Sequence, residues 1–444
     1  MTVTRPKVRD DGAGPATSSA PEDRQHPGAR STYDSAVASG FYERDAQGLH
    51  GKYDNVRRYW EDQITRQALR GFMMRLVARK RRELARIRVL DLGAGSGEGY
   101  QVLTSLRAGS DRIDTQPTNV VPSDILGFYK GIDISPAMVH QGRKLHLDNP
   151  KIDFKVGDLS HGLGACRSDL PYDLYYSSYG SLSHLKDGEL ERVIGDIYEH
   201  CGESCIFVAD LLGRYSYEWQ CYWSQPGEDE TNMRHYSMSY LYPESLLPKI
   251  SVERFPVRYW GAEEFDRFID GIVSDRGGAI ARRVLWDRSI IVGRHMNTGE
   301  FNPHAQPIRS AVNRLLAFYH RTDLQTLLFN YGPHHEFSRL NQFFESFQMA
   351  WNAVIYDAME AIDRWKDKAW LDTPPREDFP GPVREAMIAV RKIVRNIEHF
   401  RMDDPLANVI EPQLGYNLRN LEVSLQRGLG AGHGLLAIYE LKKP

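Results

Sequence analysis

A run of glycines directly after a short apolar segment is the feature that most constrains this chain. The stretch "IRVLDLGAGSGEGY" (87–100) places "IRVL" and Asp91 before glycines at positions 93, 95, 97 and 99. Glycine lets the backbone turn tightly and leaves no side chain between the backbone and a ligand. A helix that starts directly after the turn points N–H groups at that ligand. The stretch therefore predicts a strand, a tight turn and a helix around a bound molecule.

The spacing of these glycines argues against a dinucleotide. Dinucleotide-binding turns follow the pattern G-x-G-x-x-G, in which the helix start receives a pyrophosphate. In this chain the third glycine of that pattern is replaced by Glu98. An acid at the start of the helix repels a pyrophosphate, so the pattern disfavours a nicotinamide-dependent dehydrogenase.

Short apolar runs alternate with amphipathic stretches from residue 87 onward. The runs are "RVLDLG", "YKGIDIS", "IDFKVGD", "YDLYYSS" and "CIFVADLL". Strands that alternate with helices predict a parallel sheet. "AIARRVL" and "RSIIVGRH", with only "WD" between them, predict a hairpin that closes this domain near residue 296. The predicted fold is α/β: a Rossmann-like doubly wound sheet with an antiparallel terminal hairpin.

The remaining segments predict four parts for the chain of 444 residues. Residues 1–30 are rich in Pro, Gly, Ser, Asp and Arg and predict a disordered tail. We expect an N-terminal helical lid at 31–85, the core at 86–298, and a mainly α-helical accessory domain at 299–444. That domain ends in a further strand at "GHGLLAIYEL", preceded by a turn at "GLGAGHGL". Its broad apolar helix faces predict docking on the core as a roof over the pocket, and leave monomer and homodimer open.

Two further acids and a fourth motif follow the glycine loop. Asp133 follows the apolar "YKGID", Asp158 follows "FKVGD", and "YDLYYSSYGSLSHL" comes next. Together with Asp91 and its glycine loop, this ordered set resembles the motifs of class I S-adenosylmethionine-dependent methyltransferases. The resemblance covers about residues 87–296. It implies S-adenosyl-L-methionine as cofactor and S-adenosyl-L-homocysteine as product.

The resemblance also implies which residues hold the cofactor. Asp133 would accept hydrogen bonds from the ribose diol, which suits a carboxylate, and Asp158 would accept from the adenine amine. Gly93 and Gly95 would leave room for the amino-acid tail. The predicted cofactor-binding residues are Tyr53, Asp91, Gly93, Ala94, Gly95, Asp133, Ile134, Asp158, Leu159 and Ser177. The alternative is that the two acids at 133 and 158 only cap helices.

Methyl transfer needs an aligned nucleophile, a dry site and, for some acceptors, a base. Tyrosine and tryptophan are dense between residues 215 and 242, which predicts either a walled pocket or a well-packed insert. The predicted substrate-binding residues are Arg57, Tyr179, Arg214, Tyr217, Trp219, Trp223, Tyr236 and Tyr240. The predicted bases are His184 first and His235 second, although a histidine at 184 also suits the start of the following helix.

The resemblance favours a methyltransferase of the EC 2.1.1 type that acts on a small molecule in bacterial specialised metabolism. The alternatives are a protein or RNA methyltransferase that holds its partner with the C-terminal region, and a non-catalytic S-adenosylmethionine-binding scaffold. A net charge of −3 gives no general basis for binding nucleic acid. The fourth motif also lacks the Asn/Asp-Pro-Pro-Tyr/Phe string of nucleic-acid amino methylators.

The cysteine content and the lengths of the apolar runs bear on the compartment in which the protein works. Four cysteines without a Cys-x-x-Cys pair suit a reducing compartment, and no metal site is predicted. No apolar run approaches ~18 residues, so no membrane span is predicted. We therefore expect a cytoplasmic protein with a small-molecule substrate as its partner.

Overall fold

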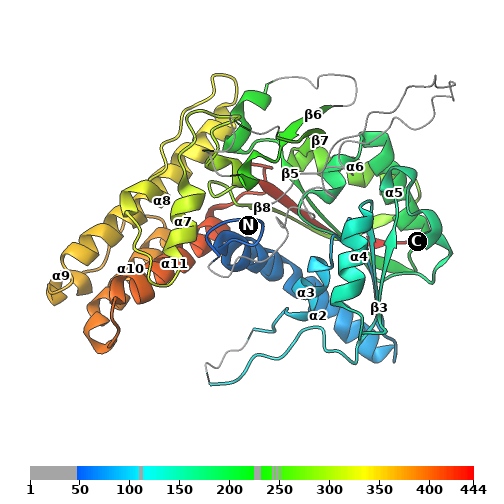
Figure 1. The fold of residues 1–444 in the computed structure, drawn as a ribbon, viewed down its shortest axis with the longest axis horizontal. Coiled ribbons are helices and arrows are strands. Elements are labelled where there is room, and N and C mark those ends of the chain that lie inside the picture. Colours follow the sequence, from blue (N-terminus) through cyan, green and yellow to red (C-terminus); the bar gives the residue numbers. More distant parts are fainter. Residues whose placement is uncertain (1–47, 110–113, 225–231, 243–244, 246–248, 250–251) are drawn as a thin grey trace, which may run out of the picture.

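The computed structural model describes residues 48–109, 114–224, 232–242, 245, 249 and 252–444 (Figure 1). The predicted disordered tail and residues 31–47 of the predicted lid lie outside this part of the chain. Among the described residues, no helix combines the length and the hydropathy that a membrane span requires.

Parallel strands form the centre of a mixed sheet. Five strands lie in the order β3-β2-β1-β4-β5, each parallel to its neighbour. Their bounds are β1 (Ile87–Leu92), β2 (Leu126–Asp133), β3 (Ile152–Val156), β4 (Leu174–Ser177) and β5 (Ser204–Gly213). The doubly wound α/β sheet predicted from the sequence is confirmed.

Helices cover both faces of this sheet, because successive side chains of a buried strand point to opposite sides. Val89 packs into the cluster with α2, α3 and α4, whereas Leu90 packs into the cluster with α5 and α6. The bounds are α2 (Asp62–Arg82), α3 (Glu98–Thr104), α4 (Pro136–Leu145), α5 (Asp187–His200) and α6 (Ala262–Ser274). The sheet is therefore the middle of three layers (Figure 1).

The antiparallel pair of the sheet is not the predicted local hairpin. Strand β8 (Ala279–Arg288) pairs with β9 (Gly434–Lys442), which also pairs antiparallel with β5 from Ser204 to Leu212. Residues 434–442 of the predicted accessory domain thus complete the core sheet. The helical region is an insertion between β8 and β9, and Figure 1 shows β9 entering the sheet from the side of that insertion.

The segment "RSIIVGRH" is apolar for a different reason from the one predicted. Ile290, Ile291 and Val292 are fully buried against the helical insertion. The N–H groups of Ser289 and Ile290 donate to the buried carboxylate of Glu422 at 2.9 and 3.0 Å. The segment therefore fills a helix interface and forms no strand.

The helical insertion has its own core. Its helices are α7 (Ile308–Leu315), α8 (Ser338–Asp363), α9 (Lys368–Asp372), α10 (Gly381–Arg395), the π-helical η11 (Leu406–Ile410) and α11 (Glu411–Leu425). Trp351 of α8 packs against Trp60 of the π-helical segment η1 (Arg57–Glu61), with ring centroids 6.0 Å apart. The insertion therefore buries its apolar faces partly against the segment that precedes α2.

A two-stranded ribbon stands beyond the end of β5. Strand β6 (Met233–Ser237) pairs antiparallel with β7 (Arg254–Trp260), and β7 meets β5 only at Leu212 and Gly213. The ribbon extends the sheet past the carboxyl ends of the parallel strands.

Candidate active site

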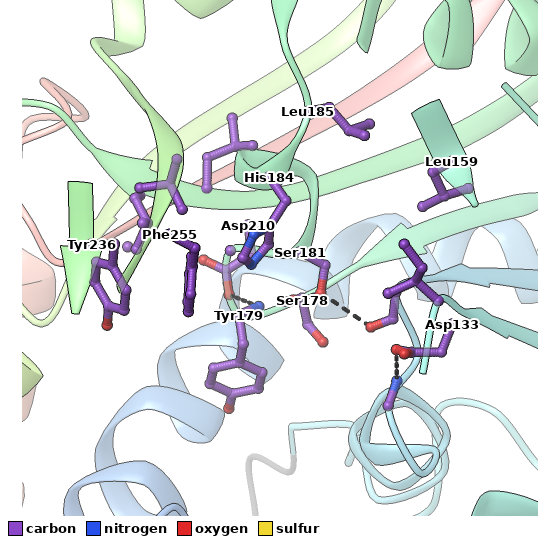
Figure 2. A pocket seen from close by; sticks show the side chains of 18 of the residues that line it. Asp133, Leu159, Ser178, Tyr179, Ser181, His184, Leu185, Asp210, Tyr236 and Phe255 are labelled. Atoms are coloured by element: carbon purple, nitrogen blue, oxygen red, sulfur yellow. Dashed lines mark hydrogen bonds between the residues drawn. The ribbon is translucent and has the colours of Figure 1, made fainter. Parts of the chain in front are cut away.

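A cavity of about 540 Å³ lies where the parallel strands end. It extends from the glycine loop after β1, past the ends of β2, β4 and β5, to the β6–β7 ribbon. Figure 2 shows Asp133 and Leu159 at one end of it, Tyr236 and Phe255 at the other, and His184 between them. Open α/β sheets bind ligands at this edge, outside the carboxyl ends of the strands.

Gly93 and Gly95 form the cavity wall next to β1. Their φ angles are +73° and +55°, in the left-handed region that glycine adopts readily. A Cβ atom on Gly93 would lie 2.4 Å from the Cβ of Ser181, whose hydroxyl donates to the carbonyl of Gly93 over 3.1 Å. The turn therefore needs glycine for its backbone angle and for the close approach of the loop after β4.

Asp133 joins the glycine loop to the start of α4. One carboxylate oxygen accepts from the N–H of Gly95 at 2.8 Å and the other from the N–H of Ser135 at 2.9 Å. Burial raises the pKa of this carboxyl above its ordinary value. Each oxygen keeps further acceptor capacity, and the side chain faces the cavity.

Ile134, Asp158 and Leu159 also line the cavity, and Figure 2 shows Leu159 at the same end as Asp133. The Asp158 side chain accepts from the N–H of Ser160 at 2.9 Å and so caps a short 3-10 turn. Asp158 therefore caps a turn and also lines the cavity, and its hydrogen bond to an adenine amine stays a prediction.

Residues 48–61, which precede α2, cover the cavity, and this segment is called the cover below. Lys52, Arg57 and Glu61 line it from this side. The Arg57 guanidinium lies over the ring of Tyr179 at 3.6 Å and near the ring of Tyr53 at 4.9 Å. Stacked guanidinium groups keep their charge and their N–H donors. Arg57 therefore presents a buried cation at this wall.

Lys52 and Glu98 form a charged pair that the sequence analysis did not assign to the site. Lys52 Nζ lies 3.7 Å from Glu98 Oε1, and the Tyr53 hydroxyl donates to the same carboxylate. Burial lowers the pKa of Lys52 to about 8. Burial alone would raise the pKa of Glu98, but Lys52 and Arg57 hold it at about 2. A charged group of each sign therefore lies beside the glycine loop.

The opposite end of the cavity is apolar and aromatic. It is built by β6, β7, the turn after β6 and the end of β5. The side chains there are Leu212, Met233, Tyr236, Met238, Tyr240, Phe255 and Val257. Tyr236 and Phe255 lie with ring centroids 5.8 Å apart. This end suits an apolar or aromatic ligand group.

Tyr179 stands between the two ends in a strained conformation. Its φ of +54° is uncommon for a residue with a side chain. Its N–H donates to Asp210 at 2.8 Å, and its hydroxyl donates to Asp62. Asp210 also pairs with Arg288 at 2.7 Å. These bonds hold the Tyr179 ring against the cavity.

A histidine that the sequence analysis assigned to a turn also lines the cavity. His433 immediately precedes β9, and its Nδ1 lies 2.8 Å from Oε1 of the fully buried Glu218. The signal available in the sequence was a polar ring among glycines in "GAGHGL" directly before an apolar strand.

The predicted walls Tyr217, Trp219 and Trp223 are wrong, because all three rings are fully buried away from the cavity lining. Tyr217 and Trp223 pack into the core of the helical insertion. The Trp219 indole donates to the carbonyl of Gly213 at 2.9 Å behind the β6–β7 ribbon. Aromatic density in this segment thus serves packing as well as the pocket.

His235 and Arg214 also lie outside the cavity lining. His235 sits in β6 with its side chain exposed, whereas its neighbour Tyr236 is buried and lines the cavity. Arg214 pairs with Glu264 at 3.7 Å. The structure therefore leaves His184 as the predicted base that reaches the cavity.

Four predicted cofactor residues lie behind or beside the cavity wall. Asp91 is buried beneath the loop and accepts from the Tyr129 hydroxyl, and Ala94 packs into the core between β1 and β2. Ser177 is buried in β4, and the next residue faces the cavity instead. Tyr53 borders a neighbouring cavity of about 430 Å³.

The predicted roof is wrong. Among the described residues, none from 297 to 432 lines the cavity. The cover is the segment before α2, and the helical insertion packs behind that cover.

The strand order and the glycine loop at the end of β1 form the Rossmann-like doubly wound sheet that the sequence resemblance to class I S-adenosylmethionine-dependent methyltransferases implies. No family model matches the chain, and no curated protein matches it.

The solved structures to which the chain is similar include methyltransferases. Magnesium protoporphyrin IX methyltransferase from Synechocystis PCC 6803, solved with bound SAM, is 16% identical over 61% of this chain and 92% of its own, with a TM-score of 0.33. The CcbJ methyltransferase from Streptomyces caelestis is 14% identical over 57% and 89%, with a TM-score of 0.33. One chain of the complex between the Haloferax volcanii Trm112 methyltransferase activator and a methyltransferase is 19% identical over 46% and 65%, with a TM-score of 0.28.

Proposed function

We propose that this chain is an S-adenosylmethionine-dependent methyltransferase that acts on a small molecule. The observation that carries the proposal is one cavity with two chemically different ends. The polar end holds the glycine loop, Asp133 and Asp158, and the apolar end holds the rings of Tyr236 and Phe255. A volume of about 540 Å³ lies within the range of small-molecule sites, ~300–1,000 Å³.

The residues at the polar end fit the chemistry of the cofactor. Asp133 retains acceptor capacity for a diol, and Asp158 faces the same space. Lys52 and Glu98 offer opposite charges for an amino-acid tail. A Cβ on Gly95 would lie 2.8 Å from Glu98 Oε2, so the cradle is open only with glycine there. When bound, S-adenosylmethionine supplies a methyl group activated by its sulfonium.

The chain's own residues would then position the acceptor and exclude water. Tyr179 and Arg57 close the cavity from the side of the cover, and the aromatic ribbon holds an apolar acceptor at the other end. Positioning of this kind is worth several orders of magnitude in rate, because it removes the entropy cost of bringing the two reactants together.

The test is binding followed by turnover. Calorimetry with S-adenosylhomocysteine should give a saturable one-site isotherm, and thermal unfolding should shift upward with the ligand. At 100-fold the Kd the ligand adds roughly 2.7 kcal/mol of stability. A folded protein that shows no isotherm and no shift would overturn the proposal. Transfer of labelled methyl to protein or RNA but to no small molecule would favour a macromolecular substrate instead.

A further inference from the structure

The segment Gly432–His433–Gly434 is fixed against the end of the sheet. A Cβ on Gly432 would lie 2.4 Å from the carbonyl oxygen of Arg288, so no larger residue fits. The N–H of His433 donates to the carbonyl of Ser289 at 3.0 Å, and its carbonyl accepts from Gly213 at 3.2 Å. The glycines therefore let the backbone of His433 pass between β5 and the end of β8. The imidazole projects from this rigid position into the cavity wall.

Glu218 is held as firmly as the histidine it contacts. Its carboxylate accepts from the N–H of His295 at 2.5 Å and from the Ser216 hydroxyl at 3.1 Å. A Cβ on Gly293 would lie 1.8 Å from Glu218 Oε1, so glycine alone leaves room for this carboxylate. Burial would raise the pKa of Glu218, but His433 and His295 hold it below its ordinary value. Glu218 therefore stays ionised beside the imidazole.

This pairing sets the proton positions on the ring. An ionised carboxylate 2.8 Å from Nδ1 requires a proton on that nitrogen. Neutral His433 then has a bare lone pair on Nε2. Among the described residues, Nε2 makes no hydrogen bond, and the ring lies in the cavity lining. The result is a cavity-lining imidazole whose Nε2 is able to accept a proton.

We infer that His433 is the base that removes a proton from a hydroxyl group of the methyl acceptor, and that Glu218 positions it. This rests on the proposed function. The acceptor oxygen uses its lone pair to bond the methyl carbon, and the carbon–sulfur bond breaks to leave neutral S-adenosylhomocysteine. The hydroxyl proton moves to Nε2, where the imidazolium is stabilised by Glu218. The proton then passes to water.

The surroundings favour a phenol-like hydroxyl. The ring of Tyr236 lies 6.5 Å from that of His433 and belongs to the aromatic end of the cavity. A phenol with a pKa near 10 is mostly protonated at neutral pH and gains from a base. Among the described residues, the titratable groups that interact with the imidazole include Glu218, Asp210 and His295. Asp210 is paired with Arg288 at 2.7 Å, and burial lowers the pKa of His295 to about 4.

His184 provides the matched comparison. It also lines the cavity, and its ring lies tilted against that of Phe255 with centroids 5.0 Å apart. It is the base predicted from the sequence, so His184→Gln tests that prediction alongside His433→Gln. Glu218→Gln keeps the shape of the positioning group but removes its charge.

The experiment uses the full chain, S-adenosylmethionine and a panel of phenol, catechol, 2-naphthol and 4-nitrophenol. We expect His433→Gln to lower kcat at pH 7 by a factor of about 100 or more, the usual scale for a lost general base. The loss should shrink for 4-nitrophenol, which is far more acidic than phenol and is partly ionised at pH 7 without a base. Glu218→Gln should lower kcat less and shift the pH profile. Affinity for S-adenosylhomocysteine should change less than threefold in both variants.

Each outcome separates this inference from the proposed function. Wild-type protein without affinity for S-adenosylhomocysteine overturns the proposed function. Wild-type protein that binds it but methylates none of the hydroxyls overturns the acceptor class. Full activity of His433→Gln, or an equal loss for every phenol, overturns the base. Nitrogen-15 NMR of labelled histidine checks the tautomer, and a proton on Nε2 rather than Nδ1 in the wild type also overturns it.

Discussion

Arg309 and Asp54 form a two-pronged ion pair that joins the helical insertion to the cover of the cavity. Arg309 Nε and Nη2 each lie 2.8 Å from an oxygen of Asp54. The same guanidinium contacts Glu61 at 2.7 Å, and Asn313 donates to Asp54 at 2.9 Å. All of these side chains are buried. The position of Arg57, which lies between Asp54 and Glu61 in the sequence, therefore depends on helix α7.

Arg309→Met should destabilise the protein strongly. Removing one partner leaves Asp54 and Glu61 as buried, uncompensated charges, which costs about 3–5 kcal/mol. Urea unfolding measures the free energy, and calorimetry should show weaker binding of S-adenosylhomocysteine because the cover loosens. Arg321→Met is the control: its pair with Asp404 at 2.8 Å is on the surface, with Arg321 66% exposed, and should cost at most about 1 kcal/mol. Equal losses in the two variants would contradict the buried clamp.

Asp133→Ala should leave a folded protein that binds S-adenosylhomocysteine about tenfold or more weakly, because a charge-assisted pair to a diol is lost. The variant also removes the bonds to Gly95 and Ser135, so Asp133→Asn, which keeps one acceptor oxygen, should fall between it and the wild type. Asp148→Ala changes an exposed acid just past α4 and should bind normally. An unchanged Kd for Asp133→Ala would show that the ribose lies elsewhere.

Gly95→Val should abolish binding of S-adenosylhomocysteine. The branched side chain would enter the cradle beside Glu98, and the φ of +55° adds strain of about 1–2 kcal/mol. Gly164→Val is matched for strain, with a φ of +51° and no atom within 4 Å of a Cβ. We expect similar losses of thermal stability in the two variants but loss of affinity only in the first. Normal affinity in Gly95→Val would contradict the assignment of the loop.

Asp91 should make the stability fall as pH rises. Burial, with Glu98 and Asp133 nearby, raises the pKa of Asp91 to about 8. Between about pH 4 and pH 8 the folded protein therefore holds a proton that the unfolded chain has lost, which lowers stability by about 1.4 kcal/mol per pH unit. Asp91→Asn cannot ionise and should lose this slope in urea unfolding at pH 5.5 and 7.5.

Asp153→Asn, in the half-buried edge strand β3, is the control and should follow the wild type. Parallel pH profiles for wild type and Asp91→Asn would show that Asp91 is ionised in the folded protein. Because Asp91 lies behind the cavity wall, its variant should bind S-adenosylhomocysteine within threefold of normal.

Local pattern was enough to predict the polar end of the site. Gly93 and Gly95, Asp133 and Asp158 each follow a short apolar run, and parallel strands bring the ends of such runs to one edge. The side chains that distant segments bring against these residues could not be predicted from local pattern. Lys52 reaches the loop only because the cover folds back over it.

Contacts with segments far apart in the sequence explain why the predicted hairpin and the predicted aromatic pocket walls were wrong. "RSIIVGRH" has the composition of a strand, yet Glu422 satisfies its N–H groups from a helix far along the chain. The burial of Trp219 and Trp223 follows from the ribbon and the insertion packing on either side of them. Periodicity reports that a side chain is buried but not against which partner, so a core ring and a pocket ring look alike.

The pairing of β9 with both β5 and β8 has a consequence for how the protein is made. A nascent chain leaves the ribosome with its N-terminus first. Strands β5 and β8 therefore emerge before the helical insertion, and β9, which pairs with both, emerges after it. Until then both strands have an unpaired side, which is the kind of edge that recruits foreign strands. The sheet that lines the cavity therefore cannot be completed until the helical insertion has been synthesised, and nascent chains should depend on chaperones that shield open sheet edges.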